Sequence, residues 1–244
     1  MEGALESHIQ EIHDQIRPGS YRQIVGNLRH MISRGAFVSI KTVVGSHNFP
    51  SFVDTLYFAK NIGATQFLYS PLSITGAATR MRLLNKVTTR AINQKVVEAV
   101  ERDPAIGPFI RSSPLARYLK VIYTKDPGIL PRVQYHINHD GRISPQDNLY
   151  EFPDYHFGDI SRKDYDFDSL RNFQVSLEQP IACQQCPVNY YCPRGDYANL
   201  TFKNEEGIGL TGEFAVCDEI RDNVYYLMTL GVRGIRLVEA ILGK

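Results

Sequence analysis

The cysteines of this chain form a pattern suited to metal binding. Cys183, Cys186 and Cys192 follow one another at Cys-x2-Cys-x5-Cys spacing, and Cys217 comes later in the sequence. A tight Cys-x2-Cys turn aims two sulfurs at one point, Cys192 adds a third from the same loop, and Cys217, at the start of a predicted helix, can return in space as the fourth. Buried structural cysteines scatter along a chain, so we interpret this cluster as a ligand set and not as inert thiols.

Four thiolates satisfy either tetrahedral zinc or a 4Fe–4S cluster, and spacing alone does not decide between them. Zinc sites usually join two close cysteine pairs, whereas the three-plus-one pattern is closer to iron–sulfur usage. His136, His139 and His156 are the other candidates for metal ligation. We interpret them as ordinary surface or hydrogen-bonded histidines.

Composition narrows the class of protein. The chain has 244 residues, 43% of them hydrophobic, with a formal net charge of +1. This charge gives no argument for nucleic acid as a partner. No apolar run is long enough to span a bilayer, and the N-terminus does not have the pattern of a signal peptide. We expect a cytoplasmic protein, whose reduced thiols favour a metal site over disulfides.

The first half of the chain alternates helical and extended patterns. The predicted elements are helices at 21–34, 51–61, 80–101 and 114–123, and strands at 37–44 and 65–70. Alternation with short loops predicts a parallel sheet covered by helices. Ligands gather outside the carboxyl ends of such strands. This rule puts loops 44–48 and 69–73 on the expected functional rim, although plain connection is our preferred interpretation of both.

A different pattern begins at Pro131. Residues 132–138 alternate in polarity, and Asp140-Gly141 precedes a short return strand, which predicts a β-hairpin. Residues 148–210 contain few periodic segments and cannot build a large core, a shortfall that a bound metal or cluster would offset. Two last helices are predicted at 217–231 and 232–242.

The cysteine pattern resembles that of radical S-adenosylmethionine (SAM) enzymes with a SPASM domain. The C-terminal extension of that family contains a Cys-x2-Cys-x5-Cys-x3-Cys segment followed by a last cysteine. Cys183, Cys186 and Cys192 match the first three positions of the segment, and Cys217 matches the last cysteine. The resemblance implies that these four residues hold the outer of two auxiliary 4Fe–4S clusters.

The ligands of the inner auxiliary cluster are not cysteines in this chain. Gln146, Lys163 and Asp196 stand at the positions where the family has cysteine ligands of the inner cluster. Gly158 matches the family glycine. Because all three positions differ together, we expect one auxiliary cluster and no inner one.

The N-terminal part resembles the segment after the fourth strand of the family's partial βα barrel. Glu2-Gly3 stands for an Asp-Gly pair, and His13-Asp14-Gln15-Ile16-Arg17 matches a His-Asp-x-x-Arg element. Met1 then falls inside the motif, and the sequence has no Cys-x3-Cys-x2-Cys loop for the SAM-cleaving cluster. The resemblance therefore implies a split subunit, a truncation or a gene fragment. Asn48 follows the strand 37–44, at the end where SAM lies in the family, but we assign it no role.

We therefore expect an α/β protein. Residues 1–125 would form the C-terminal half of a partial βα barrel, and residues 126–244 a small irregular α+β SPASM domain. The expected function is that of a fragment or subunit of a peptide- or protein-modifying radical SAM system. It would bind SAM only if a partner protein or an upstream segment supplied the missing half. The alternatives are a non-catalytic scaffold with a structural zinc or iron–sulfur site, and a non-functional fragment. Catalytic residues remain unassigned.

Overall fold

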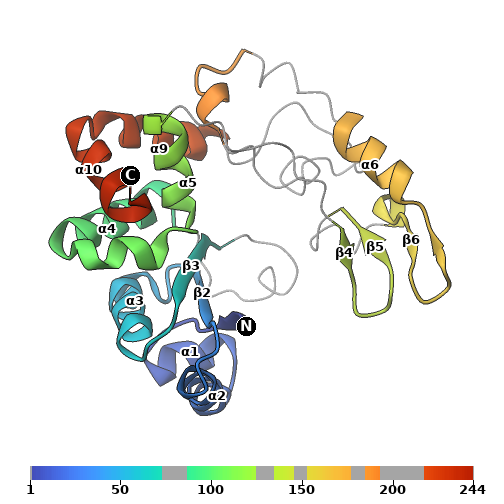
Figure 1. Cartoon of the computed structure of the whole chain (residues 1–244), viewed down its shortest axis with the longest axis horizontal. Coiled ribbons are helices and arrows are strands. Elements are labelled where there is room, and N and C mark those ends of the chain that lie inside the picture. The colour runs from blue at the N-terminus through green and yellow to red at the C-terminus, as the bar shows by residue number, and fades with distance from the viewer. Residues whose placement is uncertain are drawn as a thin grey trace. The chain divides into compact units, whose positions relative to one another are not determined.

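The computed structural model describes residues 2–72, 87–124, 135–145, 153–176, 185–192 and 217–243. The chain divides into two units (Figure 1): unit 1 is Met1–Asp126 with Asp222–Lys244, and unit 2 is Pro127–Arg221. The elements of unit 1 are β1 (Glu2–Ala4), α1 (Gln10–Ile16), α2 (Tyr21–Ser33), β2 (Ser39–Val44), η1 (Phe49–Ser51), α3 (Phe52–Asn61), β3 (Gln66–Pro71), α4 (Thr89–Arg102), η3 (Pro104–Ile110), α5 (Pro114–Thr124), most of α9 (Cys217–Thr229) and α10 (Val232–Leu242). Those of unit 2 are β4 (His136–Ile137), β5 (Ile143–Ser144), η5 (Pro153–Tyr155), β6 (Gly158–Asp159), β7 (Asp164–Tyr165), α6 (Phe167–Ser176), η6 (Asn189–Tyr191) and the first turn of α9.

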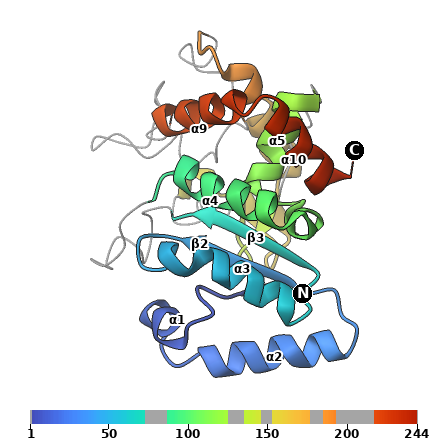
Figure 2. The same cartoon turned by 90° about the vertical axis from the view of Figure 1, so that its left-hand side faces the viewer.

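A parallel sheet organises unit 1. Its strands lie in the order β1-β2-β3, and Ile40 of β2 is paired with Gly3 of β1 and Phe67 of β3. Ile40 and Phe67 are completely buried. The chain crosses from β1 to β2 through α1 and α2, and from β2 to β3 through α3, because parallel strands need such crossovers. Figure 2 shows α2, α3 and α4 alongside the sheet. The prediction of a parallel sheet covered by helices is confirmed.

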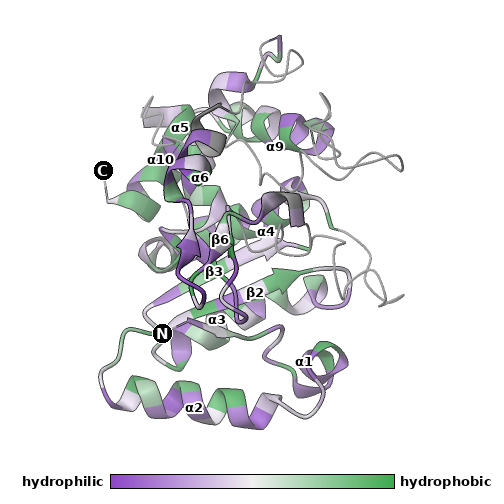
Figure 3. Ribbon diagram, turned by 90° about the vertical axis from the view of Figure 1, so that its right-hand side faces the viewer, coloured by the Kyte–Doolittle hydropathy of each residue, from purple (hydrophilic) through white to green (hydrophobic). Residues whose placement is uncertain are grey.

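An aromatic core joins this sheet to the helices that cover it. The Phe52 ring of α3 lies 5.4 Å from that of Tyr69 and 6.0 Å from that of Phe67, both on β3. The Phe67 ring is also stacked 6.2 Å from Phe109 of η3. Coloured by hydropathy, β2 and β3 carry apolar residues, while the helices around them alternate between apolar and polar ones (Figure 3). This is the pattern of elements with one buried face.

The two C-terminal helices belong to unit 1. The Tyr69 hydroxyl donates a hydrogen bond to Asn93 Oδ1 of α4 (2.8 Å), and Asn93 Nδ2 donates to Asn223 Oδ1 of α9 (3.0 Å). Arg233 of α10 makes a bidentate ion pair with Glu101 of α4, at 2.7 and 2.8 Å. We had placed all of 126–244 in one domain. The structure instead groups Asp222–Lys244 with the first unit, because apolar and polar contacts of α9 and α10 are satisfied there.

Several element boundaries differ from the prediction. Sequence reasoning missed β1 and α1, whose residues are too polar and too few to show a period. Helix α4 begins at Thr89, since the Thr88 side chain accepts a hydrogen bond from Ala91 N and caps it. The earlier start that we predicted at residue 80 falls partly outside the described residues. Helix α5 begins at Pro114 as predicted.

Two short hairpins, β4–β5 and β6–β7, lie next to each other in unit 2. In the first, Gly141 adopts a φ of +90° and its N–H donates to Asn138 O, which confirms the predicted turn. Phe157 N donates to Ile143 O and Ile160 N to Gly141 O, so the hairpins are joined by backbone hydrogen bonds. In the part of the chain that is described, no helix is long and apolar enough to cross a membrane.

We expect Gly107→Ala to destabilise unit 1 by about 2 kcal/mol, because a methyl group there would overlap the backbone carbonyl of Ala240 where η3 packs on α10. Gly26→Ala is the matched control. Gly26 is exposed within α2 and a methyl group there meets no atom, so helix propensity should raise stability by roughly 0.5–1 kcal/mol. Urea denaturation of both variants measures the difference, and equal midpoints would contradict this packing.

Candidate functional site

The carboxyl ends of β1 and β2 are tied together by one buried amide. Asn48 is completely buried, and its Nδ2 donates to Glu6 O (2.7 Å) and Val43 O (2.8 Å). Its Oδ1 accepts a hydrogen bond from Gly45 N at 3.0 Å. The side chain therefore fixes the loop after β2 against the segment after β1. This edge is where ligands bind in parallel sheets, but the polar atoms of Asn48 are used by the chain itself.

The His-Asp-x-x-Arg element surrounds Glu6 at the same edge. His13 is completely buried; its Nδ1 accepts from Glu6 N (3.1 Å), and its Nε2 lies 3.0 Å from Ser20 Oγ. Since burial lowers the pKa of His13, the ring is neutral and Nε2–H donates to the Ser20 hydroxyl. Arg17 Nε donates to the Glu6 carboxylate at 2.9 Å. Glu6 is 3% exposed, so this pairing compensates a charge held almost out of water.

Asp14, the second residue of the His-Asp-x-x-Arg element, accepts hydrogen bonds from both α1 and α2. Its Oδ1 accepts from Tyr21 N at the first turn of α2 (3.2 Å), and its Oδ2 accepts from Gln10 Nε2 (3.2 Å). The element thus holds α1 and α2 in place around Glu6. Glu2-Gly3, which we had matched to the family's Asp-Gly pair, lies inside β1 and not in the loop after it.

Hydroxyl groups form a further layer between β1 and α3. Ser7 Oγ lies 3.3 Å from Ser51 Oγ, and His8 N donates to Thr55 Oγ1 at 3.1 Å. Ser51 also donates to Asn48 O, and its side chain makes no capping hydrogen bond to α3. These residues escaped sequence reasoning because isolated serines and threonines carry no pattern.

His47 is the exception at this edge. Neither ring nitrogen has a hydrogen-bond partner, although both are buried. The ring lies against Gly45, where an added methyl group would come within 3.0 Å of His47 Nδ1. Burial lowers the pKa of His47, and the nearby Glu6 charge offsets part of this effect. A buried polar group without a partner normally has a functional or solvent explanation, so His47 is a candidate ligand contact.

The structure describes three of the four predicted cysteine ligands. Cys186, Cys192 and Cys217 are of intermediate exposure, whereas Cys183 lies outside the described residues. Asn189 N donates to Cys186 O (3.0 Å) and Cys192 N to Asn189 O (3.3 Å), so η6 folds the loop between the first two back on itself. Among the described residues, no three or more His, Cys, Asp or Glu side chains are gathered closely enough to hold a metal ion.

Arg221 lies near the start of α9, the helix that begins at Cys217. It lies one helical turn after Cys217 on α9 and forms an ion pair with Asp218. The Asp218 carboxylate raises the pKa of Arg221, and the charges of Cys186 and Cys217 add to this effect.

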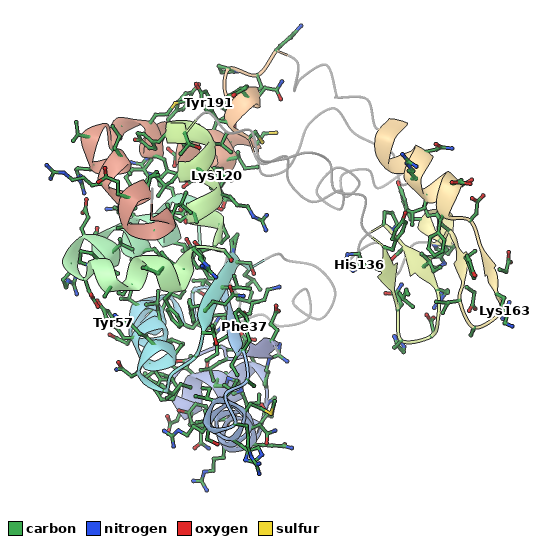
Figure 4. All side chains as sticks on the ribbon, in the orientation of Figure 1. Phe37, Tyr57, Lys120, His136, Lys163 and Tyr191 are labelled. Carbon is green, nitrogen blue, oxygen red and sulfur yellow. The ribbon has the colours of Figure 1, made fainter. Side chains whose placement is uncertain are left out.

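Of the three residues at the positions of the inner-cluster ligands, the structure describes only Lys163. Gln146 and Asp196 lie outside the described residues. Lys163 lies at the tip of the β6–β7 hairpin, in a left-handed conformation with a φ of 55° (Figure 4). Gly158 has a φ of +120°, and a side chain there would overlap the backbone of Asp164 and Tyr165. This steric constraint explains a glycine at this position without reference to a cluster.

An open hollow of about 620 Å³ lies beside these hairpins. Its carboxylates and guanidinium groups largely pair with one another: Asp140 with Arg142, and Asp159 with Arg162. The lining residues are Asp140, Arg142, His156, Gly158, Asp159, Arg162 and Asp164. Of the three candidate histidines, only His156 lines it, and His136 belongs to β4 (Figure 4).

The geometry defines an α/β fold whose likeness to solved structures is clear. No family model matches the chain, and no curated protein matches it in sequence. Among solved structures, that of native anSMEcpe with bound AdoMet and the Kp18Cys peptide matches with a TM-score of 0.69 at 13% identity, over 98% of this chain and 68% of that one. The same enzyme with AdoMet and the Cp18Cys peptide matches at 0.69 and 14% identity, and a His-tagged form with AdoMet at 0.62.

That enzyme is an anaerobic sulfatase-maturating radical SAM enzyme of the SPASM type. The chain therefore shares the fold of the matching part of that structure over nearly its whole length, with a partial parallel sheet.

We expect the free energy of unfolding to fall as pH drops below about 6.5, because burial lowers the pKa of His13 and His47 from that value in the folded state. The unfolded chain then binds protons that the folded chain does not. The stabilisation is complete above the unfolded pKa and is lost below it. Urea unfolding at several pH values measures the slope. His47→Gln should flatten it and exposed His30→Gln should not; equal slopes in both variants would contradict the assignment.

Proposed function

We propose that this chain is a radical SAM-related protein that binds one auxiliary 4Fe–4S cluster and takes part in modifying a peptide or protein side chain. The observation that carries the proposal is the likeness in fold to anSMEcpe over 98% of the chain. The solved structures of that enzyme contain AdoMet and a peptide. The spacing of the cysteines supports the same class independently of the fold.

The cysteine segment is the proposed cluster site. Its residue types suit a cluster: Cys186, Cys192 and Cys217 are half-buried cysteines, and Cys183 completes the set of four. A bound cluster would transfer single electrons or anchor the segment near the substrate.

The free edge of β1 is the proposed point of assembly. Among the described strands, β1 pairs only with β2, and its other edge has no neighbour in the sheet. An unpaired edge offers backbone donors and acceptors to a further strand. We propose that a parallel strand from an upstream segment or a partner protein completes the sheet there. The carboxyl edge with His47 would then line an adenosyl-binding pocket.

Replacing Cys186 or Cys217 by Ser should remove most of the bound iron and sulfide from anaerobically purified protein. The wild-type chain should contain about four iron atoms and equimolar sulfide, because four thiolates hold one cluster. His136→Ala is the control, since we assign no ligand role to this histidine. Iron, sulfide and zinc analysis with absorbance spectra makes the measurement. Zinc without sulfide in the wild type would overturn the cluster and favour a non-catalytic scaffold.

The isolated chain should not cleave SAM. All four of its cysteines are assigned to the auxiliary cluster, so none remains to hold a cluster with an open iron. We expect no 5′-deoxyadenosine after reconstitution with iron and sulfide and incubation with SAM and dithionite, measured by mass spectrometry beside an active radical SAM enzyme. Formation of deoxyadenosine at catalytic levels would show that the auxiliary assignment is wrong.

A further inference from the structure

Alternation along the strands gives the two hairpins of unit 2 unlike faces. Arg142 is bridged to Asp159, and Asp159 is paired with Asp164, so these three charged side chains lie on one face, beside the hollow that they line. Ile143 and Tyr165 are the next residues along the same strands, and successive side chains of a strand point to opposite faces. The face opposite the hollow is therefore apolar.

An aromatic ridge, formed by Tyr135, Tyr165 and Phe167, stands on this apolar face. The Phe167 ring, at the start of α6, lies 4.9 Å from that of Tyr135 and 5.0 Å from that of Tyr165. Both tyrosines are 47% exposed and Phe167 is 37% exposed. Ile137, two residues after Tyr135 along the strand, is 55% exposed, whereas its partner Ile143 is completely buried. A buried centre is thus bordered by exposed aromatic and aliphatic side chains.

The rings of the ridge hold one another in place. They come from three segments and pack directly together, so little side-chain freedom is left to lose on binding. Neighbouring exposed apolar groups mark interaction sites, and aromatic residues are enriched at the centres of interfaces. The aromatic ridge is therefore a candidate docking surface.

The outer edge of β4 lies beside the ridge. Asn138 N donates to Arg142 O at 2.9 Å, and this pair fixes which backbone groups point toward β5. Since these groups alternate in direction along an antiparallel strand, those of His136 also point toward β5, whereas those of Tyr135 and Ile137 point to the outer edge. Among the described strands, β5 is the only neighbour of β4. An extended segment can therefore pair with β4 on this side.

The segment 164–171, which carries two rings of the ridge, has more negative than positive charge. Its exposed charged residues are Asp164, Asp166, Asp168 and Arg171. The neighbouring Arg162 is paired with Asp159. The surface thus suits a basic partner better than an acidic one.

We propose that the peptide or protein substrate docks here, as an extended segment that adds a strand to the outer edge of β4 and lays its apolar side chains against the aromatic ridge. This inference rests on the proposed function, which assigns a peptide or protein as substrate. Backbone hydrogen bonds to Tyr135 and Ile137 would hold the segment, because strand addition draws its affinity from the main chain and its specificity from alternate side chains. Lys or Arg residues of the segment would interact with the ring faces and with the carboxylates of 164–168. The surface recognises the substrate and takes no part in the chemistry.

The experiment measures fluorescence anisotropy of the anaerobically purified full chain with a short fluorescein-labelled peptide in which Leu and Phe alternate with Lys. Tyr135→Ala should weaken binding about tenfold, since it removes an aromatic anchor. Tyr225→Ala is the matched control, because Tyr225 of α9 is also 47% exposed, and it should bind as the wild type does.

A second pair of variants tests the charge. Asp168→Asn should weaken binding about threefold, because it removes an exposed carboxylate beside Phe167. Asp54→Asn is its control, since Asp54 is likewise exposed in the first turn of a helix, α3. A probe with Glu in place of Lys should bind more weakly to the wild type.

Strand addition itself is tested on the probe, without changing the protein. N-methylation of every second residue removes the N–H groups that point to one side of an extended peptide. Of two probes methylated in alternate registers, one should lose binding about tenfold more than the other, because only one side of the peptide pairs with β4.

The outcomes separate the two proposals. A wild-type chain that binds the probe but contains no sulfide overturns the proposed cluster and leaves the docking surface standing. A chain with a normal cluster and the same probe affinity in wild type, Tyr135→Ala and Asp168→Asn overturns the docking surface alone. Equal effects of Tyr135→Ala and Tyr225→Ala, or of the two methylated probes, also contradict it. A dimer that dissociates in Tyr135→Ala, measured by sedimentation, would assign the surface to a second copy of the chain and overturn the inference.

Discussion

The buried amide of Asn48 is the constraint on which the rest of unit 1 depends. Parallel strands are joined by crossovers and not by tight turns, and here one side chain links the carboxyl ends of β1 and β2. Asn48 accepts from its own loop and donates to the segments that end β1 and β2. The same contact fixes Glu6, around which His13 and Arg17 are arranged. One side chain therefore orders both the sheet edge and the helices of the His-Asp-x-x-Arg element.

This arrangement leaves few polar groups at the edge for a ligand. The hydroxyls of Ser7, Ser51 and Thr55 bond to neighbours within the chain, and so do the nitrogens of His13. Only the ring of His47, among the described polar side chains considered at this edge, has both nitrogens without a partner. Internal hydrogen bonds thus preorganise this edge, and the His47 ring is left to contact a ligand. Preorganisation of this kind reduces the reorganisation needed on binding.

Hydrogen bonds and turn geometry hold the two hairpins of unit 2. Asp159 accepts hydrogen bonds from the backbone N–H groups of Ser161 and Arg162, which closes the β6–β7 turn. Backbone bonds from Phe157 and Ile160 join this hairpin to β4–β5. The left-handed Lys163 and Gly158 fit the turn by conformation. Hydrogen bonds and turn geometry therefore hold these two hairpins together.

Long periodic segments were predictable from the sequence because local patterning decides them. The elements α2, α3, β3 and α5, the Asp140-Gly141 turn and the parallel sheet followed from apolar spacing, glycine and proline. Short elements such as β1 and α1 did not, since a few polar residues acquire their conformation from pairing with β2 and packing around Glu6. Local sequence patterns also could not predict that α10 and most of α9 belong to unit 1. Asn93 meets Asn223, and Glu101 meets Arg233, only in the folded chain.

The sequence by itself determined the cysteine ligand set as a candidate, since clustering and spacing are properties of the chain. The tertiary structure decided which groups meet in space: the Glu101–Arg233 ion pair of α4 and α10, and the buried Asn48 that we had left without a role. The physical reason is the same in both cases. Electrostatic and hydrogen-bond partners are chosen by distance in space, and a sequence records only distance along the chain.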